Sequence, residues 1–169
     1  MSKIEVNIDQ LLCKMADDLK IMLDKKDHKD PLMIGIQTGG IWVAERLCQL
    51  ISIKKPLGHL NIAFYRDDFS RIGMQPRVTP SKLPFQIEDK HIILVDDVLH
   101  TGRTIRAALN EIFDYGRPAS VSLAVLIERG GQELPIRADV VGKRMDLKDN
   151  EHVKLCGPEP LALELKTTE

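Results

Sequence analysis

In the stretch Ile92-Ile93-Leu94-Val95-Asp96-Asp97-Val98-Leu99-His100-Thr101-Gly102-Arg103-Thr104, four apolar residues predict a buried strand. Two acids follow it, then a short turn, and then a predicted helix over residues 105–115. A strand that leads through a Thr/Gly turn into a helix forms an anion site, because the first backbone N–H groups and the positive end of the helix dipole face the ligand. The two carboxylates would repel phosphate, so we expect them to face hydroxyl groups or a metal ion. A phosphorylated sugar offers both chemistries.

This stretch resembles the phosphoribosyl-pyrophosphate (PRPP) signature of type I phosphoribosyltransferases, in which strand, acid pair and Thr-Gly-x-Thr turn share one register. The plain alternative is a buried strand followed by a turn without a ligand. The Leu-Val-Asp-Asp segment alone also occurs in receiver domains of response regulators. There the acids end the first strand, near the start of the chain, and no Thr-Gly-x-Thr turn follows.

The bulk composition is that of an ordinary globular protein. The chain has 169 residues, 43% of them hydrophobic and 29% charged, and a net charge of −1. We expect a single phosphoribosyltransferase domain over residues 1–169, cytoplasmic and without a membrane segment. Nothing in the overall charge marks a nucleic-acid binder, although a local basic patch is compatible with it. The three cysteines are far apart and predict neither a disulfide framework nor a zinc site.

Helices and strands alternate along the predicted chain. Helical spacing covers residues 8–26, 41–51 and 105–115, and apolar runs predict strands at 32–36, 60–65, 92–95, 121–127, 140–141 and 153–155. This order predicts an α/β fold with a central, mostly parallel sheet flanked by helices, and ligands at the carboxyl ends of the strands. A second strand–turn–helix unit passes through Gln37-Thr38-Gly39-Gly40. Neither the dinucleotide-binding nor the P-loop glycine pattern occurs.

A long polar stretch at about residues 66–84 exceeds the length of a simple connector. It carries several prolines and basic residues. It is either a mobile loop that covers the site or a solvated insertion without a catalytic role.

The chain resembles one branch of the type I family, the bifunctional pyrimidine operon regulator / uracil phosphoribosyltransferases (PyrR). The matching segments are Tyr65-Arg66-Asp67-Asp68, Val95 to Thr104, Gly116-Arg117-Pro118, Glu128-Arg129-Gly130, Leu134-Pro135-Ile136-Arg137-Ala138-Asp139 and Gly142-Lys143. The resemblance implies a type I phosphoribosyltransferase fold, with a small hood at about residues 137–160. It implies the reaction uracil + PRPP → UMP + pyrophosphate, with Mg²⁺.

The resemblance also assigns roles to individual residues. It places the 5′-phosphate and ribose of PRPP or UMP on Asp96, Asp97, Val98, Leu99, His100, Thr101, Gly102, Arg103 and Thr104. Pyrophosphate would contact Thr38, Gly39, Gly40 and Arg66. Magnesium would bind through PRPP and waters near Asp96 and Asp97, since it retains waters and bridges substrate oxygens.

For the base, the resemblance assigns Arg129 and the backbone of Val153, although Arg129 at a strand end is also compatible with a plain surface residue. His100 is a third candidate catalytic residue beside Asp96 and Asp97, because a neutral imidazole can take the uracil N1 proton near pH 7. PyrR proteins usually carry Tyr at this position. The alternative is that His100 only packs on the ribose.

Two departures from the family pattern carry expectations. Many members have Thr-Arg-Gly where this chain has Thr38-Gly39-Gly40, so we expect modestly weaker PRPP binding with chemistry retained. The face that binds leader RNA in Bacillus-type regulators is thinned by Cys13, Asp17, Asp18, Met22 and Gln132. The remaining candidate RNA face is Arg137, Lys143 and Arg144, and strong RNA binding of the Bacillus type is not expected.

Three hypotheses therefore remain for function. The first is a uracil phosphoribosyltransferase that also regulates pyr gene expression. The second is an RNA-binding attenuator that responds to UMP or UTP and retains residual catalysis. The third is a phosphoribosyltransferase for hypoxanthine or guanine. The resemblance further implies a homodimer or larger homo-oligomer.

Overall fold

The computed structural model describes residues 2–62 and 80–168, and the structural statements below concern these residues. Five parallel strands form the main sheet in the order β3-β2-β4-β5-β6. Their bounds are Gly58–Leu60 (β3), Leu32–Ile36 (β2), His91–Leu99 (β4), Ser120–Arg129 (β5) and Val140–Met145 (β6). The helices are Ile8–Lys25 (α1), Gly39–Ile51 (α2) and Arg103–Tyr115 (α3).

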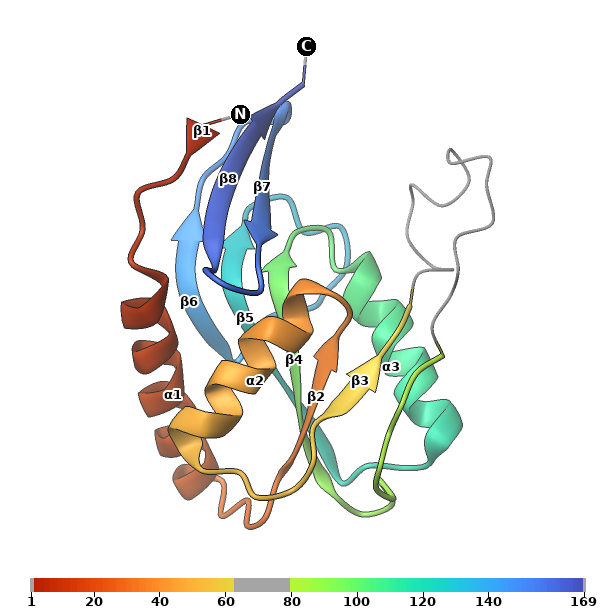
Figure 1. Cartoon of the computed structure of the whole chain (residues 1–169). Coiled ribbons are helices and arrows are strands. Elements are labelled where there is room, and N and C mark those ends of the chain that lie inside the picture. The colour runs from red at the N-terminus through yellow and green to blue at the C-terminus, as the bar shows by residue number, and fades with distance from the viewer. Residues whose placement is uncertain (1, 63–79, 169) are drawn as a thin grey trace.

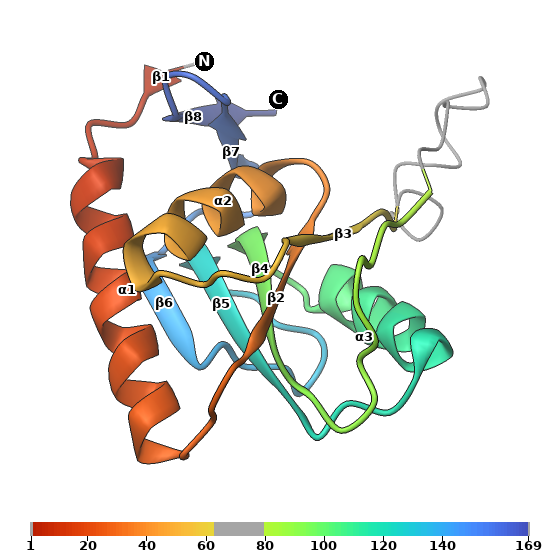
Figure 2. The same ribbon diagram turned by 60° about the horizontal axis from the view of Figure 1, so that its bottom comes forward.

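Helices cover both faces of this sheet, with α1 and α2 on one side and α3 on the other (Figures 1 and 2). Neighbouring residues of one strand enter different cores. Met33 and Ile93 pack in the cluster with α1 and α2, whereas Ile34 and Leu94 pack in the cluster with α3. A strand that is buried on both faces has to be apolar at successive positions, which explains the unbroken runs in β2 and β4.

The strand order changes direction between β2 and β4. From β2 the chain passes through α2 to β3 on one side, and the next strand, β4, lies on the other side of β2. The two helices that follow these strands therefore begin on opposite faces of the sheet. In open α/β sheets such a change of direction leaves a crevice at the carboxyl ends of the two strands. Ligands of open α/β sheets bind at such a position.

A second, antiparallel sheet lies beyond the carboxyl ends of the main strands (Figure 1). Its order is β1-β8-β7, with β1 Ser2–Lys3, β7 Glu151–Cys156 and β8 Ala162–Thr167. The sequence predicted a hood at about residues 137–160. In the structure β6, with Val140 and Gly142 buried, belongs to the main sheet, where it pairs with β5. The separate sheet instead contains strands from both ends of the chain.

Other element boundaries follow the sequence to different degrees. Strand β2 has the predicted bounds, and α1 is one residue shorter than predicted. Helix α2 begins two residues early, at Gly39, and β4 continues four residues past Val95, so that both acids lie within the strand. Strand β3 covers Gly58–Leu60, and residues 63–65 of the predicted 60–65 strand lie outside the described residues.

Candidate active site

The two glycines at the start of α2 lie directly against the acid pair of β4. A Cβ atom on Gly40 would be 2.6 Å from the carbonyl oxygen of Val95 and 3.1 Å from the Cα of Asp96. A Cβ atom on Gly39 would be 2.7 Å from the Cγ of Asp97. The atoms nearest to the Cβ position of Gly40 belong to the backbone of β4, so the first turn of α2 can approach β4 this closely only because residue 40 is glycine. The atoms nearest to the Cβ position of Gly39 belong to the side chain of Asp97.

Thr38 is the exposed N-cap residue of α2, and its side chain makes no capping hydrogen bond. The early N–H groups of a helix lack partners within the helix, and together with the helix dipole they favour an anion. The positive end of α2 therefore lies beside two carboxylates at the crevice. There it can attract an anionic ligand on one side and the two carboxylates on the other.

The two acids differ in their surroundings. Asp96 is 3% exposed and accepts a hydrogen bond from the backbone N–H of Asp97 at 2.9 Å. Asp97 is half-buried and accepts from the backbone N–H of Val98 at 2.9 Å. Because more of Asp97 reaches solvent, its carboxylate is the better placed of the two to meet a ligand, while Asp96 helps to fix the strand end.

The Thr-Gly-Arg-Thr turn begins α3 as the sequence predicted. Gly102 is its N-cap residue at φ 92°, a left-handed conformation that glycine adopts without strain, and the backbone N–H of Arg103 donates to the Thr101 Oγ1 at 3.2 Å. Thr104 is half-buried in the first helical turn. Leu99 is buried and Val98 half-buried against the core, so we expect only their backbone to be available to a ligand.

A loop after β5 is hydrogen-bonded to the Thr101–Thr104 turn. The backbone N–H groups of Glu133 and Leu134 both donate to the carbonyl oxygen of Thr101, at 3.0 and 3.2 Å. The Glu133 carboxylate also forms a 2.6 Å ion pair with Arg103. The sequence indicated the Glu-Leu-Pro segment only as a family motif. Its contact with Thr101 was missed because no local pattern reveals a bond between segments thirty residues apart.

His100 lies between β4 and the Thr101–Thr104 turn and is half-buried. Its Nε2 atom would be 3.1 Å from a Cβ atom on Gly131, so the imidazole packs closely against that loop. Burial, followed by the positive charge of Arg129 and the proximity of His152, lowers the pKa of His100 from the usual 6.5, and Glu133 and Asp149 partly oppose this. The imidazole is therefore neutral at pH 7 and able to accept a proton.

Arg129 is a buried residue at the end of β5, 5% exposed, and not the surface residue of the plain alternative. Its Nη1 donates to the carbonyl oxygen of Glu151 at 2.8 Å, and its Nη2 donates to that of Lys148 at 3.4 Å. Its Nε is buried without a partner among the described residues. The guanidinium thus links the main sheet to the start of β7, the strand that carries half-buried Val153.

The remaining candidates are exposed residues of the described part of the chain and one residue outside it. Arg137, Lys143 and Arg144 are exposed, and Arg144 forms a 2.6 Å ion pair with Glu128 across β5 and β6. Arg66 lies outside the described residues, as does most of the predicted 66–84 loop. Within the part of the chain that is described, no helix is long and apolar enough to cross a membrane.

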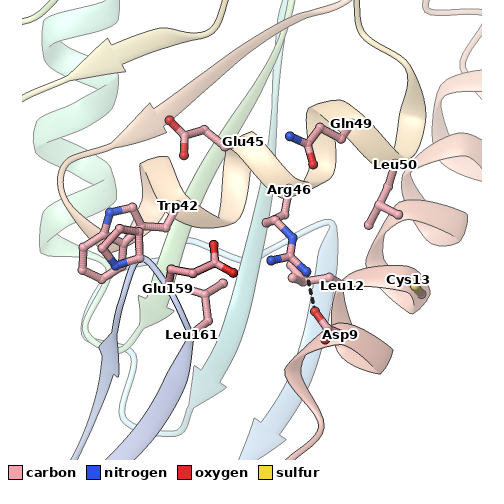
Figure 3. Close-up of a pocket in the computed structure, with 11 residues that line it drawn as sticks. Asp9, Leu12, Cys13, Trp42, Glu45, Arg46, Gln49, Leu50, Glu159 and Leu161 are labelled. Atoms are coloured by element: carbon pink, nitrogen blue, oxygen red, sulfur yellow. Dashed lines mark hydrogen bonds and ion pairs between the residues drawn. The ribbon is translucent and has the colours of Figure 1, made fainter.

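A cavity of about 460 Å³ lies between α1, α2 and the turn before β8 (Figure 3). Asp9, Glu45 and Glu159 line it, and its one lining arginine, Arg46, is paired with Asp9. Three carboxylates against one arginine make this cavity a poor site for a polyphosphate. A smaller cavity of about 210 Å³ lies beside Thr38, and Trp42 lines both.

Comparisons with known proteins agree with this geometry. The family model described as "Phosphoribosyl transferase domain" matches residues 7–159. The chain is 60% identical to the "Bifunctional protein PyrR" of Nitrosococcus oceani over 165 residues, which are 96% of this chain and 93% of that protein. It is 56% identical to the protein of the same name from Pseudomonas aeruginosa over 160 residues, 95% of this chain and 94% of that protein.

Solved structures of low sequence identity share the fold. The hypoxanthine phosphoribosyltransferase of Trypanosoma cruzi matches with a TM-score of 0.70 at 19% identity, covering 99% of this chain and 98% of that one. A hypoxanthine-guanine phosphoribosyltransferase from Bacillus anthracis matches with a TM-score of 0.70 at 16% identity, covering 90% and 86%. The predicted type I phosphoribosyltransferase fold is confirmed.

Proposed function

Because this chain belongs to the phosphoribosyl transferase family, within its PyrR branch, we propose that it converts uracil and PRPP to UMP and pyrophosphate and also takes part in pyrimidine-responsive regulation. The observation that carries the enzymatic role is the position of the acid pair of β4, against the first turn of α2 and directly before the turn that begins α3. The base is inferred from the PyrR relatives at 56–60% identity, since the purine-specific structures are similar only in fold. PRPP-dependent formation of UMP from labelled uracil tests this assignment.

We propose that the turn Thr101–Thr104 binds the 5′-phosphate through backbone N–H groups and threonine hydroxyls at the start of α3. Asp97, with Asp96 behind it, accepts hydrogen bonds from the ribose hydroxyls. The pyrophosphate end then falls on Thr38, Gly39 and Gly40, where the first turn of α2 supplies backbone donors. The developing charge on the leaving pyrophosphate would be stabilised by these fixed donors.

Mg²⁺ fits this arrangement as a cofactor. Magnesium prefers oxygen ligands and is commonly held by one or two carboxylates together with substrate phosphates and waters. Asp96 and Asp97 provide two carboxylates at the crevice, of which Asp97 is the more accessible. When bound, the ion would neutralise charge on the leaving pyrophosphate.

We propose that Arg129 contributes to uracil binding mainly by holding neighbouring backbone in place. Its guanidinium donates to the carbonyls of Lys148 and Glu151, and so holds the backbone around Val153 where a planar base can meet it. We propose that the backbone of Val153 supplies the edge-on hydrogen bonds that distinguish the base.

Proton transfer at His100 gives the first testable consequence. If its neutral imidazole accepts the uracil N1 proton, kcat/KM falls as the pH drops through its lowered pKa, below 6.5, because the protonated ring can no longer accept. The His100→Phe variant should lose about 10²-fold in rate together with this acidic decline. His100→Tyr keeps a ring that packs on the ribose. Unchanged turnover of both variants across pH 6 to 9 would exclude a catalytic role.

RNA binding is the second candidate function, favoured by the relatives' name and by a groove between α1 and β6. Lys14, Lys25, Lys26 and Arg144 line it, but with them lie Asp18 and Asp139. Lys14 pairs with Asp18 at 3.3 Å, Lys26 with Asp139 at 3.6 Å and Arg144 with Glu128. Cations that already have acidic partners gain less from phosphate contacts.

We therefore expect pyr leader RNA to bind with a Kd above about 1 µM at physiological salt, in the range of non-specific binding. An Asp18→Asn variant should bind more tightly, because Lys14 is then released from its pair. Gel-shift titration with and without UMP measures both. Submicromolar, UMP-stimulated binding by the wild-type protein would contradict this expectation.

We further propose that the protein forms a homodimer or a larger assembly, and light scattering measures its mass in solution.

A further inference from the structure

The pyrophosphate end of the crevice lacks a cation in its own turn. Thr38, Gly39 and Gly40 offer backbone donors and one hydroxyl, and Asp97 adds a negative charge next to Gly39. Pyrophosphate carries several negative charges, and a helix N-terminus contributes only about half a unit charge. The turn itself cannot balance the negative charge of the leaving pyrophosphate. Residues that lie next to the turn are therefore candidates to supply positive charge.

The cavity of about 210 Å³ begins at this turn. Thr38 and Trp42 line it from α2, and His59 and Lys82 line it from the far edge of the main sheet. Among the described residues that line it, none is acidic. The lining of this cavity contains a lysine and no carboxylate, whereas three carboxylates line the cavity on the other side of Trp42. The smaller cavity therefore suits an anion.

Strand register explains why His59 and Lys82 reach this cavity. His59 is the parallel partner of Gly35, and the backbones of His59 and Lys82 exchange two hydrogen bonds of 2.7 Å. Directly paired residues present their side chains on the same face of a sheet. On that face the backbone of α2 crosses Gly35, where a Cβ atom would lie 2.8 Å from the Cα of Ile41. Both side chains therefore face the beginning of α2.

We propose that Lys82 binds the pyrophosphate group of PRPP, with the His59 ring as a second hydrogen-bond donor beside it. The exposed ammonium sits on a flexible stem that can cross the cavity to Thr38. Lys82 thus supplies, from the neighbouring strand edge, the positive charge that the Thr38-Gly39-Gly40 turn does not contain. This inference rests on the proposed phosphoribosyl transfer and deepens it by naming a substrate contact.

The test compares Lys82→Gln, Lys82→Arg and a control, Lys90→Gln, which removes an exposed lysine at the opposite end of β4. In Lys82→Gln we expect the KM for PRPP and the inhibition constant of pyrophosphate to rise about tenfold, as for loss of one charge-assisted hydrogen bond. The KM for uracil and the Kd of UMP, which has no pyrophosphate, should stay within twofold. Lys82→Arg should recover most of the loss, and Lys90→Gln should match the wild type.

Equal pyrophosphate inhibition in Lys82→Gln and Lys90→Gln would overturn the proposal. So would a rise in the UMP Kd as large as the rise for pyrophosphate, since that pattern indicates a general distortion. Thermal unfolding of Lys82→Gln should be unchanged, because the pairing of residue 82 with His59 uses only backbone atoms. Failure of the wild-type protein to use uracil would count against the proposed function, while direct calorimetry with pyrophosphate still decides the role of Lys82.

Discussion

Replacing Gly40 with alanine is expected to lower kcat/KM by about 10²-fold, the order of loss produced by small displacements of catalytic groups. The new methyl group would lie 2.6 Å from the Val95 carbonyl oxygen and 3.1 Å from the Asp96 Cα. Both are backbone atoms of the central strand, so α2 would have to move away from β4. The backbone N–H groups in the first turn of α2, which we propose bind pyrophosphate, would then be displaced relative to the acid pair. Steady-state kinetics with PRPP as the varied substrate measures the loss.

Gly130→Ala is the matched control for this variant. A Cβ atom on Gly130 meets nothing within 4 Å, and the residue lies in the loop directly after β5. Its kinetics and unfolding should match the wild type, whereas Gly40→Ala should also lose about 1–3 kcal/mol of stability through overpacking. A Gly40→Ala variant with kcat/KM within threefold of the wild type would contradict the close approach of α2 and β4.

Replacing Arg129 with methionine is expected to affect both stability and uracil binding. The change removes donors to the carbonyls of Glu151 and Lys148 in a buried setting, and unsatisfied buried groups cost about 1–3 kcal/mol each. We expect a loss of about 2–4 kcal/mol in the free energy of unfolding, measured by urea denaturation. Because β7 loses its link to β5, the KM for uracil should rise about 10²-fold, far more than the KM for PRPP.

Arg117→Met, a change at an exposed arginine in the turn after α3, serves as the control and should leave both quantities unchanged. Arg129→Lys should recover only part of the loss, since an ammonium cannot reproduce the geometry of the guanidinium fork. Wild-type stability and an unchanged uracil KM in Arg129→Met would show that the buried contacts are dispensable.

The central strands β2, β4 and β5 were predictable because they are largely buried on both faces and contain long apolar runs. Strand β2 has the predicted bounds for that reason. The end of β4 was missed because the apolar run stops at Val95 while the pairing with β5 continues to Leu99. The start of α2 was missed because glycine has a low helix propensity, and here packing against Asp96 and Asp97 outweighs it.

The second sheet was largely hidden from the sequence. Strands β7 and β8 mix charged with apolar residues, and β1 has only two residues, so each segment carries a weak strand signal alone. Its pairing joins the two ends of the chain, which local patterns do not encode. The burial of Arg129 was equally hidden, since arginine is rarely buried and its carbonyl partners lie some twenty residues away.

The position of the Thr101–Thr104 turn beside the acid pair was predictable from the sequence because one continuous segment carries both. The neighbourhood of Thr38 was not predictable, since His59 and Lys82 come near it through strand pairing across a long insertion.

The most direct test of the central claim measures PRPP-dependent conversion of labelled uracil to UMP, with Mg²⁺ and with hypoxanthine and guanine as competing bases. We expect UMP and pyrophosphate in equal amounts, no purine nucleotide, and loss of product when PRPP or Mg²⁺ is omitted. Formation of purine nucleotides, or no turnover of any base, would contradict the claim.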